Sequence, residues 1–98
     1  MADAKLRRAI AFEAARLMYE RTESEYFTAK RKAAARVCRG SVKPSDLPSN
    51  AEIRYHLAKV LAQSGRRTEA REELREAMKT GRPFEGSHEA ARLLKALH

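Results

Sequence analysis

The sequence IRYHLAKVLAQSGRRTEAREELREAMKTGRP, residues 53–83, carries the clearest structural signal in this chain of 98 residues. Apolar side chains recur there at helical spacing in two runs, one before and one after Gly65. The runs are Ile53, Leu57, Val60 and Leu61, and then Ala70, Leu74, Ala77 and Met78. This pattern predicts two amphipathic helices joined by a short glycine turn. Because alanines recur on both helices, we expect the backbones to approach closely in a tight antiparallel hairpin.

The same residues resemble one unit of the tetratricopeptide repeat, whose two helices carry small and large residues at fixed offsets. The matching positions are Leu57-Ala58, Leu61, Ala70, Leu74, Ala77 and Pro83. Arg54 departs from the pattern, because the family has a large aromatic residue there. The residues that follow Gly81 resemble the extra helix that commonly ends such an array. The resemblance implies a helical binding module rather than an enzyme.

Composition favours a single all-α domain. Only 4 Gly and 3 Pro interrupt a sequence that is rich in helix-forming residues. The net charge of +8 favours acidic partners, nucleic acid among them, without specifying one. The single cysteine, Cys38, excludes an internal disulfide and fits a reducing compartment. No apolar run suits a membrane helix or a signal peptide, so we expect a cytoplasmic protein.

An apolar stripe predicts a first helix over residues 3–21. The stripe consists of Leu6, Ile10, Ala14, Leu17 and Met18, widened by Phe12 and Ala15. Thr22 and Glu25 have the spacing of a capping box, so residues 3–39 form either one long helix or two. We expect the stripe to dock on the hairpin of residues 53–83, because each would otherwise leave an apolar face bare.

Turn residues and caps divide the rest of the chain. Two prolines mark residues 41–49 as a linker between an N-terminal helical segment, residues 1–40, and the hairpin with its capping helix, residues 50–98. We expect these parts to pack as one compact domain. The predicted N-caps of the later helices are Ser49, Thr68 and Ser87.

The N-terminal half carries a second resemblance. Residues 11–50, which begin AFEAARLMYE and end KPSDLPSN, resemble the leader region of predicted bacterial nucleotidyltransferases. The catalytic part of that family, a Gly-Ser pair followed by an Asp-x-Asp metal site, does not occur in this sequence. The resemblance therefore implies no transferase activity, and suggests a helical leader joined to a repeat.

Six positive charges and no acid occur between residues 30 and 43: Lys30, Arg31, Lys32, Arg36, Arg39 and Lys43. Three of them share one helical face at spacings of four and three, and such a face suits phosphate contacts. Tyr26 and Phe27, just before them, could stack on bases. The simpler interpretation, which we favour, is a solvated basic helix with both aromatic rings in the core.

The tetratricopeptide resemblance also implies a binding face. The first helix of a unit usually lines the concave groove, which places Tyr55, Lys59, Ala62 and Gln63 there. Lys59 would then clamp a partner carboxylate, with Tyr55 as an amphipathic anchor. The alternative is that Tyr55 packs on the N-terminal helix and that Lys59 is merely exposed. The sequence leaves both open.

No pattern indicates catalysis, a metal or a cofactor. His56, His88 and His98 lack the spacing of a ligand set, and a metal site needs three or four convergent ligands. Cys38 has no evident catalytic partner, and we expect it to be a small buried thiol.

The sequence thus predicts an all-α fold of helical hairpins, with one tetratricopeptide-like unit and a capping helix packed on a long or broken N-terminal helix. The predicted function is a non-catalytic protein–protein interaction module that binds a protein or peptide, and the net charge leaves an acidic partner open. A small basic nucleic-acid-binding protein acting through residues 30–43 is the alternative. The two unlike halves also leave open an artificial helical chain without a natural role. A monomer is favoured over a homodimer.

Overall fold

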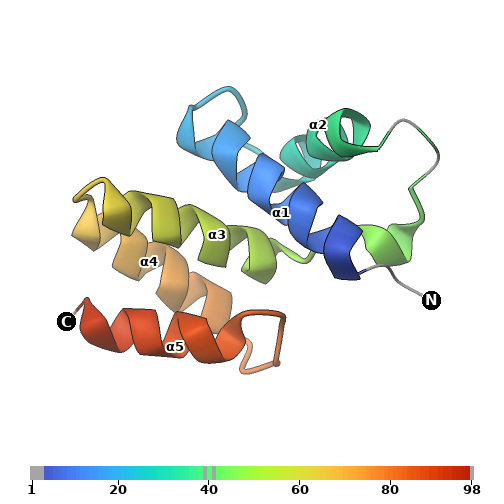
Figure 1. Ribbon diagram of the computed structural model, residues 1–98. Coiled ribbons are helices and arrows are strands. Elements are labelled where there is room, and N and C mark those ends of the chain that lie inside the picture. The colour runs from blue at the N-terminus through green and yellow to red at the C-terminus, as the bar shows by residue number, and fades with distance from the viewer. Residues whose placement is uncertain (1–3, 39, 41, 98) are drawn as a thin grey trace. The chain divides into compact units, whose positions relative to one another are not determined.

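The computed structural model describes residues 4–38, 40 and 42–97, and these residues form an all-α structure (Figure 1). In chain order the helices are α1 (Ala4–Tyr19), α2 (Tyr26–Val37), the short 3-10 helix η1 (Pro44–Asp46), α3 (Asn50–Gln63), α4 (Arg67–Met78) and α5 (Ser87–Ala96). The predicted fold class is confirmed, and the described residues contain no strand. The chain divides into two compact units, Met1–Pro48 and Ser49–His98, called here the N-terminal and C-terminal units.

In the N-terminal unit, α1 and α2 pack against each other as a hairpin, so two helices form rather than one (Figure 1). Helix α1 ends in a Schellman motif. The N–H of Thr22 donates to the carbonyl of Leu17 at 3.0 Å, and the N–H of Arg21 donates to that of Met18 at 3.1 Å. Arg21 adopts a φ of +62° without being glycine, which costs about 1–2 kcal/mol. The predicted capping box is wrong, because α2 begins after Glu25, whose side chain makes no capping bond.

Alanine forms the inner face of α2. Its buried residues are Ala29, Ala33 and Ala34, and α1 buries Ile10, Ala11, Ala14, Ala15 and Leu17. Phe12 does not widen this stripe as predicted, since its side chain is 57% exposed. It lies about 200° around the helix from Ile10 and therefore faces away from the buried side. The docking of the α1 stripe on the C-terminal hairpin stays a prediction.

The C-terminal unit is built on the hairpin of α3 and α4, with α5 packed mainly on α4 (Figure 1). Gly65 ends α3 as predicted and has a φ of +83°. The N–H of Arg66 donates to the carbonyl of Leu61 at 2.9 Å, and that of Gly65 to the carbonyl of Ala62 at 3.1 Å. This is again a Schellman motif, here with the glycine that a left-handed residue favours.

Apolar side chains from all three helices form the core of this unit. The buried ones are Ile53, Leu57, Ala58, Leu61, Ala70, Leu74, Ala77, Ala90 and Leu97. Arg54, which replaces the large aromatic residue of the repeat pattern, forms an ion pair of 2.8 Å with Glu73 on α4. The hairpin and the helix after it are therefore present, while their assignment to the tetratricopeptide family stays a prediction.

The predicted N-caps have different outcomes. Ser49 caps α3 as expected, with its Oγ accepting from the N–H of Glu52 at 3.2 Å. Thr68 and Ser87 are not caps, because they lie within the first turns of α4 and α5. The N-cap of α4 is Arg66 and that of α5 is Gly86, whose φ is +96°.

Truncating either core leucine of the hairpin should test this packing. Leu57→Ala and Leu74→Ala should each lower the free energy of unfolding by about 2–5 kcal/mol, through lost burial and a cavity. Leu74 should have the larger effect, because it is 0% exposed and Leu57 is 7% exposed. Urea denaturation followed by circular dichroism measures the loss. Lys95→Ala, at an exposed position of α5, is the control and should change stability by less than about 0.5 kcal/mol.

Candidate functional site

The predicted anchor Tyr55 packs against its own unit. Its side chain is 8% exposed, and a Cβ added to Gly86 would lie 2.6 Å from its ring. The ammonium nitrogen of Lys59 lies 4.8 Å from the ring centroid, a cation–π contact. Burial, and then the carboxylate of Glu89, raise the pKa of the Tyr55 hydroxyl, which therefore stays protonated at neutral pH. The turn before α5 thus fills the space beside this ring.

Tyr55, Lys59 and Gln63 share one face of α3, at intervals of four residues. Lys59 is half-buried and Gln63 is exposed. The three predicted partner-binding residues therefore lie side by side, but Tyr55 presents little surface to a partner. Sequence reasoning missed its contact with Gly86, because the two residues come from segments far apart in the chain. A binding role for this face stays a prediction.

His56 lies beside Tyr55, and the two ring centroids are 5.3 Å apart. Burial, and then the positive charge of Lys59, lower the pKa of His56 to about 4. The imidazole is therefore neutral at neutral pH. In the described residues no group of three or more His, Cys, Asp or Glu gathers as a metal site. His98 lies outside that part of the chain, and the thiol of Cys38 is free and only half-buried, rather than buried as predicted.

Two of the six cations in the predicted basic cluster form ion pairs within the N-terminal unit. Lys32 pairs with Glu23, and Arg36 pairs with Glu13 at 3.0 Å, so both cations are engaged within the N-terminal unit. Arg39 lies outside the described residues, and Lys30 is half-buried. The charges that remain for an external ligand are therefore fewer than the sequence indicated.

Two exposed cations of the cluster keep their charge available. The side chains of Arg31 and Lys43 have no acidic partner in the part of the chain that the structure describes. The guanidinium carbon of Arg31 lies 5.7 Å from the ring centroid of Phe27, within the range of a cation–π contact. Lys43 follows in the linker, directly before η1.

A groove of about 290 Å³ lies on the N-terminal unit, with Arg31 in its lining and Lys43 next in the chain to the lining residue Val42. It is lined by Phe27, Arg31 and Ala34 of α2 and by Val42 and Leu47 of the linker, and it is called here the α2 groove. The three α2 residues share one helical face, because they are four and three positions apart. The expectation of Phe27 in the core is wrong, since its side chain is 68% exposed. Phe27 lies about 200° around the helix from the buried Ala29 but close in angle to the buried Ala34, so it stands at the edge of the inner face, with most of its ring in solvent.

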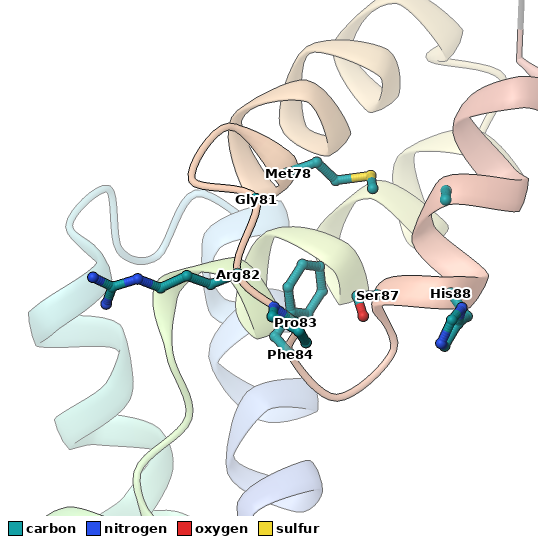
Figure 2. Close-up of a pocket in the computed structure, with 8 residues that line it drawn as sticks. Met78, Gly81, Arg82, Pro83, Phe84, Ser87 and His88 are labelled. Atoms are coloured by element: carbon teal, nitrogen blue, oxygen red, sulfur yellow. The ribbon is translucent and has the colours of Figure 1, made fainter.

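A second hollow, of about 270 Å³, lies where α4 ends and α5 begins (Figure 2). Its lining includes Met78, Pro83 and Phe84, with Ser87 and His88 at its rim. Figure 2 shows the side chain of Met78 reaching toward α5, and that of Arg82 extending away from Phe84. Because this guanidinium points elsewhere, the hollow is mainly apolar and has little charge to select a ligand.

Comparison with known proteins does not assign the chain to a family. No protein-family model, curated protein or solved structure matches the chain. Within the described residues, no helix combines the length and the apolar character needed to cross a membrane. Function must therefore be argued from the surfaces themselves.

A matched pair of glycine variants should test the contact between Tyr55 and the turn before α5. Gly65→Ala should cost about 1–2 kcal/mol, from the positive φ alone, because nothing lies within 4 Å of its added Cβ. Gly86→Ala should cost about 1–3 kcal/mol more, because the new methyl group displaces the Tyr55 ring. Urea denaturation compares the two, and the extra loss should vanish in a Tyr55→Ala background. Equal losses for the two glycine variants would contradict the contact.

His56 should make stability depend on pH. Its folded pKa of about 4 lies below the ordinary value of 6.5, so the unfolded chain binds a proton first as the pH falls. The contribution of His56 is therefore complete above pH 6.5 and declines as the pH falls toward about 4. His56→Gln should flatten this part of a plot of unfolding free energy against pH. Parallel curves for the two proteins would show that His56 does not titrate in this way.

Proposed function

We propose that this chain is a non-catalytic helical protein-interaction module that docks its partner at the α2 groove. The observation that carries the proposal is the 68% exposed side chain of Phe27 beside an apolar groove. Burying such a ring stabilises a complex by about 1.5–3 kcal/mol. Aromatic and arginine residues are also the usual energetic centres of interfaces, and here Phe27 and Arg31 stand together.

The C-terminal unit serves as a second, independent surface in this proposal. Its hairpin and third helix suit a tetratricopeptide-like unit, and of the three predicted partner-binding residues on α3, Lys59 and Gln63 are the two that a partner could reach. We keep the predicted cytoplasmic location and the monomeric state, which rest on the sequence arguments given above. The tetratricopeptide resemblance supports a binding role without naming the partner.

Nucleic-acid binding through residues 30–43 is the weaker candidate. A strand is held by a series of cations that neutralise successive phosphates. Lys32 and Arg36 already pair with carboxylates of their own unit, which counts against such a series. The protein-interaction function is therefore preferred.

Site-specific photo-crosslinking should identify the docking surface. A benzophenone amino acid placed at position 27 should give discrete protein adducts in native extract that do not form when it is placed at position 95. Adducts at position 63 instead would move the surface to α3, and adducts removed by nuclease would favour nucleic acid. Mass spectrometry then identifies the partner.

Titration with the purified partner should complete this test. Phe27→Ala should weaken binding by at least about 10-fold, which equals about 1.4 kcal/mol. Phe12→Ala is a matched control, because Phe12 is a similarly exposed phenylalanine on α1. Equal losses in the two variants, or no adduct specific to position 27, would contradict docking at the α2 groove.

A further inference from the structure

The α2 groove combines apolar walls with unpaired positive charge, and this combination selects one kind of occupant. We propose that it binds an acidic amphipathic segment of a partner protein. An apolar side chain of that segment enters the groove, and its carboxylates pair with Arg31 and Lys43. This inference rests on the proposed function and specifies the chemistry of the partner.

The size and lining of the groove fit a side chain. Its volume of about 290 Å³ lies just below the ~300–1,000 Å³ that is usual for small-molecule sites. Apart from Arg31, its lining consists of Ala34, which is only 7% exposed, the half-buried Val42 and Leu47, and the ring of Phe27. All these contact groups are hydrocarbon, so they favour an aliphatic or aromatic residue of the partner.

The charge around the groove fits carboxylates. Helix α2 carries four cations and no acid, the exposed Glu25 stands at its N-cap, and the acid closest in sequence to the linker lining, Asp46, is only 8% exposed. The surface field there is therefore positive, and a negatively charged segment is attracted to it. Arg31 is already positioned by its contact with Phe27, so less side-chain entropy is lost when it binds an anion.

A protein segment fits better than a nucleic-acid strand. Arg31 lies over the ring of Phe27 and competes with a base for that face. The groove is also lined by Val42 and Leu47, whose aliphatic side chains complement a hydrocarbon side chain better than a polar base. Lys32 and Arg36, which would extend the cationic track, are held by Glu23 and Glu13.

The proposal can be tested with synthetic peptides and the full chain. The probe is a fluorescein-labelled helical peptide of glutamate, leucine and phenylalanine. Its two companions replace leucine and phenylalanine by alanine, or glutamate by lysine. Fluorescence anisotropy should show binding of the acidic amphipathic peptide alone. Phe27→Ala should weaken it by at least about 10-fold, and so should the double variant Arg31→Glu/Lys43→Glu.

A charge-matched control separates site binding from general attraction. Arg92→Glu/Lys95→Glu has the same net charge as the groove variant, and both replaced residues are exposed on α5. It should change the affinity by less than about 2-fold, because screening limits the reach of distant charges. Circular dichroism should show that all variants keep the parent helical content, since every replaced side chain is exposed.

Four results would overturn the proposal. Equal losses in the two charge-reversed variants would mean general attraction, and equal binding of the alanine peptide would mean that the groove is not used. Tighter binding of oligothymidylate, lost on Arg31→Glu/Lys43→Glu, would assign the groove to nucleic acid. Protein adducts at position 27 without binding of the acidic peptide would overturn this inference alone. Absence of those adducts would instead remove the proposed function.

Discussion

Close packing between alanine-rich helix faces is the constraint on which both units depend. Helix α2 buries three alanines and no larger side chain, and the hairpin of α3 and α4 buries Ala58, Ala70 and Ala77 among its leucines. Small side chains let helix backbones approach, but each contributes little apolar area. Stability therefore depends strongly on the few large buried residues, such as Ile53 and Leu74, which are 0% exposed. The free energy of unfolding of such a unit is small, so a cavity in its core removes a large part of it.

The same packing also determines which side chains stay exposed and can contact a partner. The core of the N-terminal unit takes only alanines from α2, and Phe27 lies mostly in solvent, in a groove that it shares with residues of the linker. Lys32 and Arg36 form ion pairs with Glu23 and Glu13, whereas Arg31 and Lys43 have no acidic partner among the described residues. Packing and pairing thus reduce a run of six cations to a small amphipathic site next to an exposed aromatic ring.

In the C-terminal unit, by contrast, the aromatic residue Tyr55 is buried. Tyr55 is covered because Gly86, at a φ of +96°, brings the backbone of the turn against its ring. Tyr55 thus packs within its own unit, whereas the tetratricopeptide resemblance would have it face a partner. Arg54 occupies a position where the repeat pattern has a large aromatic residue. It forms an ion pair with Glu73 instead, and both side chains are 25% exposed. These features give the two units different surfaces, because the ring of Phe27 is mostly exposed and that of Tyr55 is covered.

The sequence by itself determined the helical class, the hairpin around Gly65 and the cap at Ser49, because periodicity, glycine and capping chemistry act between residues that are close in the chain. It could not determine the turn at Arg21, since a left-handed arginine carries no local signal and persists only where the packed hairpin offsets its strain. The exposure of Phe27 was accessible in part from its phase relative to Ala29, but the groove was not. Val42 and Leu47 join it only through the path of the linker, and the contact of Tyr55 with Gly86 arises only when α5 folds back. Such contacts depend on tertiary structure, because they join residues that are far apart in the chain and that no local sequence pattern relates.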